Sequence, residues 1–111
     1  MIHVYCELRE PMARMRITGH ADYAQEGYDP VCAAISSYVL LLQELLFEVG
    51  EPQCIREIRR GYAEMDLPDS CRMTVAAMLL AMGRLERLYP SCIKIEPLID
   101  ARKRPQEEKK A

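Results

Sequence analysis

Residues 13–36 read ARMRITGHADYAQEGYDPVCAAIS, and they predict where a strand ends and where a helix begins. The first five residues alternate apolar with charged side chains, a pattern that places them on the two faces of a β-strand. Asp29 then precedes a long apolar-periodic segment as a favoured N-cap, and Pro30 suits the first helical position because no N–H is needed there. His20 is therefore expected just past a strand end, and Cys32 in the first turn of a helix.

This placement makes Cys32 a candidate nucleophile. The unpaired N–H groups of a helix start and the positive end of the helix dipole favour an anion, so they favour a thiolate over a thiol. His20 is a candidate base, because the loop between the two residues can fold back toward the helix. A histidine and a cysteine 12 positions apart are a weak signal by spacing alone. The residues by themselves support a thiol nucleophile and nothing finer.

The block around this pair resembles the ribosomal-processing cysteine protease family called Prp. The resemblance is carried by Gly-His-Ala at 19–21, by Gly27 and Asp29 in the loop, and by Val-Cys-Ala-Ala-x-Ser at 31–36. As a looser pattern it extends to about Leu98. It implies a small dimeric α/β protein that cuts after bulky hydrophobic residues. Its implied substrate and partner is the short N-terminal extension of a bacterial large-subunit ribosomal protein, and it implies no metal or organic cofactor.

The resemblance also implies roles for single residues. His20 and Cys32 match the family's catalytic pair, while Asp29 and Ser36 match polar positions beside it. Pro30 departs from the β-branched or aliphatic residue that is expected before Val31. The implied reaction is attack of the Cys32 thiolate on the scissile carbonyl, with His20 as general base and then acid. Backbone N–H groups at the helix start, including that of Cys32, would hold the oxyanion.

Three residues beside the pair each have two interpretations. Asp29 caps the helix, which is our default, or it orients His20. Ser36 lies one helical turn after Cys32, where its hydroxyl bonds the catalytic pair or bonds back to a helix carbonyl. Gly27 is the hinge of a lid formed by residues 21–28, or it only permits a positive φ before the helix.

Composition and charge fit one cytoplasmic domain. A chain of 111 residues, half of them apolar, supplies one core. No secretory signal and no run near the roughly 18 apolar residues of a membrane span are recognisable, so we expect no membrane partner. The formal net charge is −2, and the tail is basic, so the body is acidic and predicts no nucleic-acid surface. We expect a single domain over residues 1–100 and a charged, disordered tail over residues 101–111.

The five cysteines form no Cys-x-x-Cys pair, and their odd number leaves one unpaired. This favours reduced thiols in a cytosol over a disulfide framework, and it gives poor support to a zinc site. Buried free cysteine behaves as a small hydrophobe. We therefore expect structural roles for the cysteines other than Cys32, namely Cys6, Cys54, Cys71 and Cys92.

The rest of the chain predicts the order ββαββαβ. Strands are expected over residues 2–9, 14–18 and 93–96, a hairpin over 53–67 with its turn at 60–61, and helices over 30–49 and about 70–88. This order predicts an α+β fold, a two-layer sandwich in which a mostly antiparallel sheet carries both helices on one face.

Each helix has an apolar stripe that is expected to face the sheet. The first stripe comprises Val31, Ile35, Tyr38, Leu42, Leu45, Leu46 and Val49, and the second Val75, Met78, Leu79, Met82, Leu85 and Leu88. The first helix has further apolar residues beyond its stripe, namely Val39, Leu40, Leu41 and Phe47. A second helix or a partner subunit is expected to cover this surplus, which gives the implied homodimer partial support.

Two other functions remain open from the sequence. In the first, the chain is a noncatalytic protein-binding or ribosome-assembly module of the same fold, and Cys32 is a buried helix residue. Alternatively, Cys32 performs a different thiol chemistry such as peroxide sensing, which normally needs a resolving cysteine. Peptide hydrolysis is the leading hypothesis.

Overall fold

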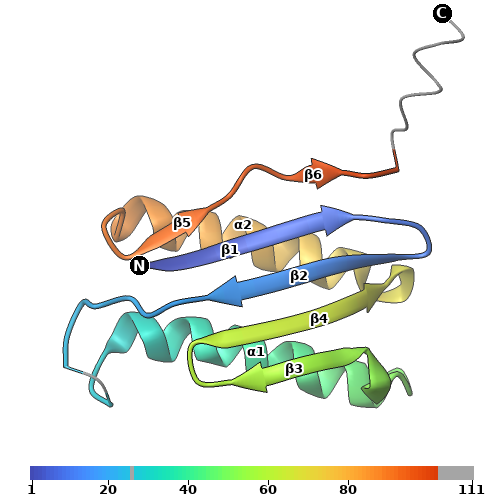
Figure 1. Ribbon diagram of the computed structural model, residues 1–111, viewed down its shortest axis with the longest axis horizontal. Helices are drawn as coiled ribbons and strands as arrows, with labels where there is room; N and C mark the ends of the chain where they lie inside the picture. Colours follow the sequence, from blue (N-terminus) through green and yellow to red (C-terminus); the bar gives the residue numbers. More distant parts are fainter. Residues whose placement is uncertain (26, 103–111) are drawn as a thin grey trace, which may run out of the picture.

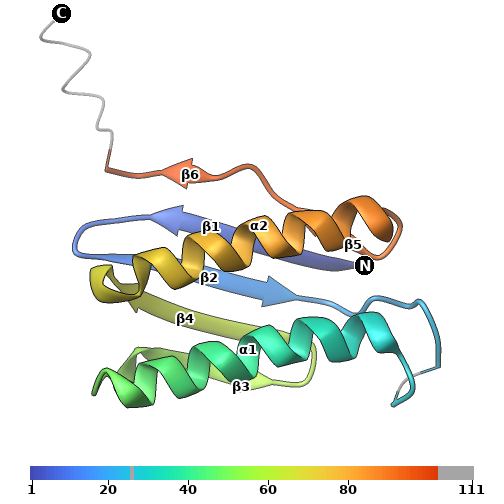
Figure 2. The same ribbon diagram turned by 180° about the vertical axis from the view of Figure 1, so that it is seen from behind.

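A computed structural model describes residues 1–25 and 27–102. Two helices cover one face of a mixed sheet (Figure 1, Figure 2). The elements are β1 (Ile2–Leu8), β2 (Met12–Thr18), α1 (Pro30–Glu48), η1 (Pro52–Cys54), β3 (Ile55–Arg59), β4 (Tyr62–Pro68), η2 (Asp69–Cys71), α2 (Arg72–Leu88), β5 (Ile93–Ile95) and β6 (Ile99–Asp100). The predicted α+β fold with both helices on one face is confirmed. The predicted tail lies outside the described residues beyond Arg102.

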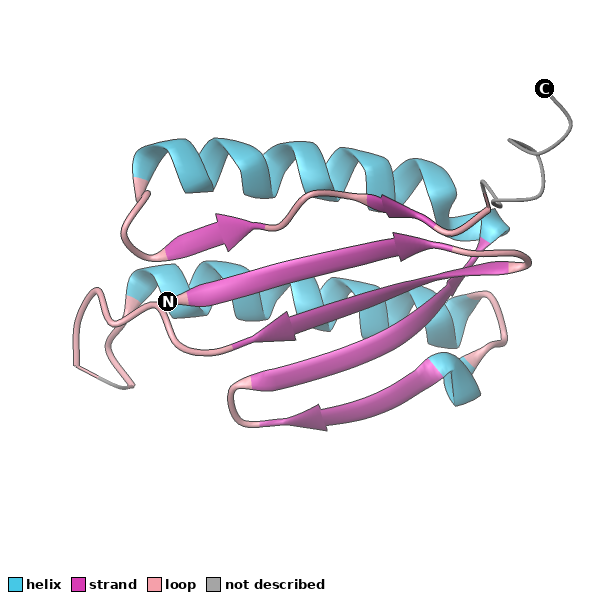
Figure 3. Cartoon of the chain, turned by 45° about the horizontal axis from the view of Figure 1, so that its top comes forward, coloured by secondary structure: helices cyan, strands magenta, loops and turns pink. Residues whose placement is uncertain are grey.

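The sheet has the strand order β3-β4-β2-β1-β5, with β6 also paired to β1. The pairs β1–β2, β2–β4 and β3–β4 are antiparallel, whereas β5 and β6 both run parallel to β1. Figure 3 shows the two short strands following one another along the same edge of β1. The β6 strand was not predicted, because two residues are too few for a periodic pattern.

The core lies between the sheet and the helices. Alternate strand residues are buried there, as expected for a half-covered sheet, and each fully buried aliphatic side chain contributes roughly 1.5–3 kcal/mol. The buried strand residues include Ile2, Val4, Met15, Ile17, Ala63, Met65 and Leu67, and the buried helix residues are Val31, Ile35, Leu42, Leu46, Val75, Met78 and Met82.

Two residues of the predicted stripes do not face the core. Leu88 is 70% exposed, because the helical period brings the next residue, Tyr89, against the core instead. Val49 is 39% exposed at the C-cap position that follows the end of α1 at Glu48. The remaining stripe residues are buried or pack against the core as predicted.

The uncovered face of the sheet carries interacting polar side chains. Arg14 Nε lies 2.8 Å from Asp66 Oδ1, and the Arg16 guanidinium lies 4.7 Å from the centroid of the Tyr5 ring. His3 points away from the core, because it alternates with buried Ile2 and Val4, and its Nδ1 lies 2.8 Å from Glu96 Oε2. This face is therefore adapted to water, which leaves the opposite face to hold the core.

Helix α1 has more apolar surface than the sheet covers. Leu40 is 62% exposed, Leu41 is 51% exposed and Phe47 is 56% exposed, and Figure 2 shows α2 beside α1 rather than over it. By length and composition, α1 is long and apolar enough to span a membrane, so the prediction that no segment approaches this limit is wrong. A core helix passes the same test, and one side of α1 packs against the sheet.

Candidate active site

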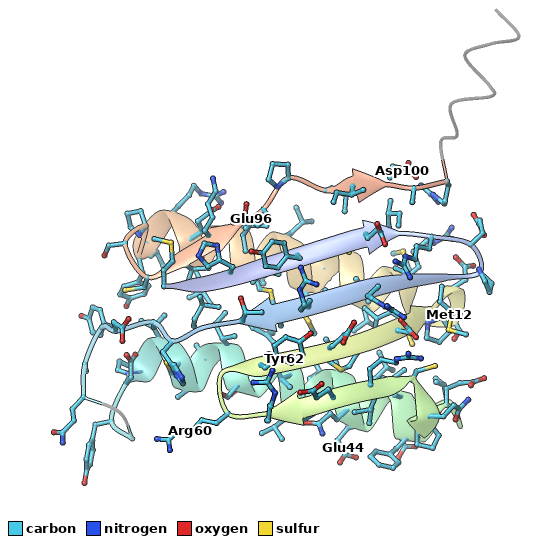
Figure 4. All side chains as sticks on the ribbon, in the orientation of Figure 1. Met12, Glu44, Arg60, Tyr62, Glu96 and Asp100 are labelled. Atoms are coloured by element: carbon cyan, nitrogen blue, oxygen red, sulfur yellow. The ribbon has the colours of Figure 1, made fainter. Side chains whose placement is uncertain are left out.

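The loop between β2 and α1 brings His20 and Cys32 to one cavity of about 720 Å³. It is lined by this loop, by α1 as far as Gln43, and by the β3–β4 hairpin around its turn, together with Ile2 of β1 and Ile17 of β2. Figure 4 labels Arg60 in that turn, on the side of the molecule where the loop lies. Residues far apart in the sequence therefore meet around the predicted pair.

His20 is positioned by the backbone on either side of the cavity. The N–H of Gly19 donates to the carbonyl of Gly61 at 2.9 Å, which fixes the chain one residue before the histidine. Gly19 has φ +93°, and a Cβ there would lie 2.2 Å from the carbonyl oxygen of Met1, so only glycine fits. The exposed imidazole of His20 rests against Gly61. Within the described residues it makes no hydrogen bond.

Cys32 lies in the first turn of α1, and it differs from the other cysteines in its accessibility. The other four are buried as predicted, whereas Cys32 is half-buried and lines the cavity. The backbone N–H of Ala21 donates to the Cys32 Sγ at 3.3 Å. The residue after His20 is thus in contact with the sulfur. No hydrogen bond joins the imidazole to the sulfur among residues 1–25 and 27–102.

Asp29 is the N-cap of α1, as our default interpretation expected. Its Oδ1 accepts from the N–H groups of Val31 and Cys32 at 2.9 and 3.1 Å, and its Oδ2 accepts from those of Tyr23 and Ala24 at 2.9 and 3.1 Å. Burial alone would raise the pKa of this carboxyl, but the four N–H donors prevail and hold the pKa below its ordinary value of 3.8. Both oxygens are occupied by backbone donors, and no hydrogen bond to His20 is found in the described part of the chain.

The same contacts correct one expectation about the oxyanion. The N–H of Cys32 is already bonded to Asp29, and the N–H of Ala33 donates to the Asp29 carbonyl at 3.0 Å. The expected donor at the helix start is therefore engaged in this conformation. The N–H that faces the sulfur is instead that of Ala21.

Ser36 and Gly27 both line the cavity. The back-bond considered for Ser36 is formed one residue later, where Ser37 Oγ donates to the Ala33 carbonyl at 2.9 Å. The Ser36 hydroxyl makes no hydrogen bond within the described residues, so it faces the cavity without a competing partner. Gly27 has φ +90°, which accounts for a glycine at this position whether or not it is also a hinge.

Sequence reasoning missed two residues that contact the pair. Ala21 belongs to the Gly-His-Ala triplet that carried the resemblance, but nothing local indicated that its N–H meets the sulfur. Gly61 was predicted only as a turn residue, because its contact with His20 depends on the pairing of β2 with β4. No cluster of three potential metal ligands is found among residues 1–25 and 27–102.

The chain is similar to one known protein family and to several solved structures. The family model described as cysteine protease Prp matches residues 1–94. The ribosomal processing protease Prp from S. aureus with a covalently linked product peptide has a TM-score of 0.69 and 21% identity, over 90% of this chain and 99% of that chain. The same protease with a substrate peptide has a TM-score of 0.64 and 20% identity, over 86% and 98% of the two chains.

The protein SMU.848 from Streptococcus mutans is similar to the same extent, with a TM-score of 0.67 and 24% identity over 90% of this chain and 95% of that chain. No curated protein sequence matches the chain. These structural likenesses show a shared fold. The family model covers most of the chain, including both His20 and Cys32, and the chain therefore belongs to the Prp family of cysteine proteases.

Proposed function

We propose that this chain is a cysteine endopeptidase that removes the short N-terminal extension of a bacterial large-subunit ribosomal protein. The S. aureus relative, a ribosomal processing protease seen with substrate and product peptides, supports this substrate class. The observation that carries the proposal is the convergence of His20 and Cys32 on one cavity from two separate elements. The backbone N–H of Ala21, the residue after His20, donates to the Cys32 Sγ and so ties the two sides of the site together.

The reaction proceeds by covalent catalysis. His20 takes the thiol proton, and Cys32 Sγ forms a bond to the scissile carbonyl carbon while the carbonyl electron pair moves onto oxygen. The tetrahedral species then expels the amine, which receives the proton from His20, and a thioester remains. Water attacks the thioester carbonyl and gives a proton to His20. The C–S bond then breaks to release the new carboxyl end, and the sulfur takes the proton from His20, which restores the thiol and the neutral imidazole. The first step therefore requires the imidazole and the sulfur to be within hydrogen-bonding distance when the substrate is bound.

The cavity also supports the preference for bulky hydrophobic residues that the family resemblance implies. Three apolar side chains, Val39 and Leu40 of α1 and Ile58 of β3, line the same cavity as Cys32. They would take a large apolar side chain of a bound peptide out of water. Ser36, which faces the same space, hydrogen-bonds the catalytic pair or the bound peptide.

A trimming assay tests the function directly. The purified chain is incubated with the extended ribosomal protein and with its already trimmed form, and the products are identified by mass spectrometry. Cys32→Ala and His20→Ala should each lower kcat by at least about 10³-fold, because each removes a reacting group. His3→Ala is the matched control, since His3 lies on the uncovered face of the sheet. Full trimming by Cys32→Ala would contradict the assignment of Cys32 as the nucleophile.

The chain acts as a homodimer that covers the part of the surplus apolar surface of α1 that does not line the cavity. Exposed Leu41 and Phe47 are the side chains that a partner copy would bury. Leu41→Glu should shift the protein to monomer in sedimentation-velocity runs, while Leu80→Glu on α2, at a similarly exposed leucine, should not. A wild-type protein that sediments only as a monomer would contradict this arrangement.

The site of action follows from the substrate. Ribosomal proteins mature in the cytoplasm, and four buried free cysteines suit its reducing conditions. Cell fractionation should therefore recover the chain in the soluble fraction. Recovery with the membranes would contradict this location and would give a different meaning to the apolar helix α1.

A further inference from the structure

The turn between β3 and β4 touches the imidazole of His20. A Cβ built on Gly61 would lie 2.8 Å from His20 Nε2 and 3.3 Å from Cε1. Carbon and nitrogen atoms that are not bonded do not approach so closely, so the imidazole occupies the space that any other residue at this position would fill. Figure 4 labels Arg60 and Tyr62, the two residues that flank this glycine at the turn.

Gly61 also holds the backbone that leads into His20. Its carbonyl accepts from the N–H of Gly19 at 2.9 Å, one residue beyond the last paired residues of β2 and β4, Thr18 and Tyr62. The strand pairing therefore continues through Gly61 to the residue just before the histidine. One glycine thus contacts both the chain and the ring of the candidate base.

His20 needs such support, because its side chain is exposed and forms no hydrogen bond within the described residues. A free imidazole samples several rotamers, and a general base must be held near the proton that it takes. We propose that Gly61 is a positioning residue for His20, which seats the imidazole against the β3–β4 turn on the cavity side. This inference rests on the proposed role of His20 as the proton acceptor.

The geometry separates the effect on the site from the effect on the fold. The atoms that an added Cβ would meet belong to the end of a side chain with two rotatable bonds, not to the backbone. The imidazole therefore yields by rotation, and the sheet keeps its structure. Displacement of a catalytic group by about 1 Å costs on the order of 10² in rate, so kcat of Gly61→Ala should fall about a hundredfold with a smaller change in KM.

Gly50 supplies a matched control. Both glycines have a positive φ, +72° at Gly61 and +75° at Gly50, but a Cβ at Gly50 would meet nothing within 4 Å. Gly61→Ala and Gly50→Ala therefore impose the same backbone strain, and they differ in the contact with His20. Gly50→Ala should keep the wild-type kcat and lose as much thermal stability as Gly61→Ala.

The imidazole itself supplies a readout that does not depend on activity. The chain has two histidines, so NMR spectra of histidine-labelled protein contain two sets of ring signals, which the variant His20→Gln assigns. Gly61→Ala should shift the ring signals of His20 and leave those of His3 in place. Gly50→Ala should shift neither.

If Gly61→Ala does not fold, Gly61→Asn and Gly50→Asn replace the pair, because asparagine tolerates a positive φ and still carries a Cβ. Unchanged His20 signals in the folded Gly61 variant, or equal kcat values for the Gly61 and Gly50 variants, would overturn the positioning role. Retained trimming by His20→Gln would instead refute the role of His20 as the proton acceptor, and failure of the wild-type chain to trim would refute the proposed function. In both cases the ring signals would still report whether Gly61 seats the imidazole.

Discussion

The N–H of Ala21 points to the Sγ of Cys32 at 3.3 Å, so the residue next to His20 is bonded to the sulfur of the helix start. This contact joins the loop between β2 and α1 to the proposed nucleophile. It also places a hydrogen-bond donor on the sulfur, where the proposed mechanism requires negative charge before attack.

Cys32 should react with iodoacetamide at least about tenfold faster than any other cysteine near neutral pH. It is half-buried, whereas burial raises the pKa of the Cys6 and Cys54 thiols and keeps them from reacting. Peptide mass spectrometry after timed labelling measures the five rates. The instructive comparison is Cys71, which also precedes a helix but is 1% exposed. Equal rates at these two positions would favour a buried, inert Cys32.

Asp29→Asn should lower the Tm by about 4 °C or more, and it should also slow trimming. The carboxylate accepts hydrogen bonds from four backbone N–H groups, but the amide can accept only through its one oxygen. Its NH₂ group faces either the two N–H donors of the loop or the two of the helix start, and that pair loses its acceptor. Calorimetry and the trimming assay measure the two effects. Asp22→Asn is the control for Tm, because the Asp22 side chain is 81% exposed. A similar Tm loss in both variants would contradict the special role of Asp29.

The contribution of Asp29 to stability should depend on pH. Its pKa is lower in the folded chain than the ordinary value of 3.8, so the unfolded chain takes up the proton first as the pH falls. The contribution is therefore complete above about pH 4 and is lost as the pH drops through the folded pKa. The Tm difference between wild type and Asp29→Asn should narrow over that range in calorimetric scans from pH 7 to pH 3. A constant difference would show that the charge is not involved.

Gly19→Ala should destabilise the chain much more than Gly27→Ala. Both positions have a similar positive φ, +93° and +90°, which costs an alanine about 1–2 kcal/mol. The added Cβ at Gly19 would also lie 2.2 Å from the Met1 carbonyl oxygen, whereas at Gly27 it would meet nothing within 4 Å. Urea unfolding measures both free energies. Equal losses would mean that the start of the chain moves away from Gly19 without cost.

Local patterns predicted the elements of this fold well. The alternation in β1 and β2, the Asp29 cap and the Arg60-Gly61 turn are each fixed by neighbouring residues, and the structure has them where they were predicted. The short β6 strand was missed, because its pairing depends on the free edge of β1 and not on its own two residues.

Those parts of the site that depend only on neighbouring residues in the sequence could be predicted. The positions of His20 and Cys32 beside a strand end and a helix start follow from short-range signals. The contact of Gly61 with His20 spans 41 positions and depends on the register of β2 with β4, which no short pattern determines. The engagement of the Cys32 N–H by Asp29 agrees with the predicted cap, but the same N–H was also expected to hold the oxyanion, and these two roles compete for one group.

A single carboxylate fastens two segments of this site, since one oxygen of Asp29 serves the loop and the other serves the helix start. If either segment opens alone, one oxygen of that buried carboxylate loses its hydrogen-bond donors. Amide hydrogen exchange at Tyr23, Ala24 and Val31 should therefore occur with one common opening rate, as a cooperative unit that melts before the sheet. The site would then be lost in a single step on warming, while the strands beneath it remain folded.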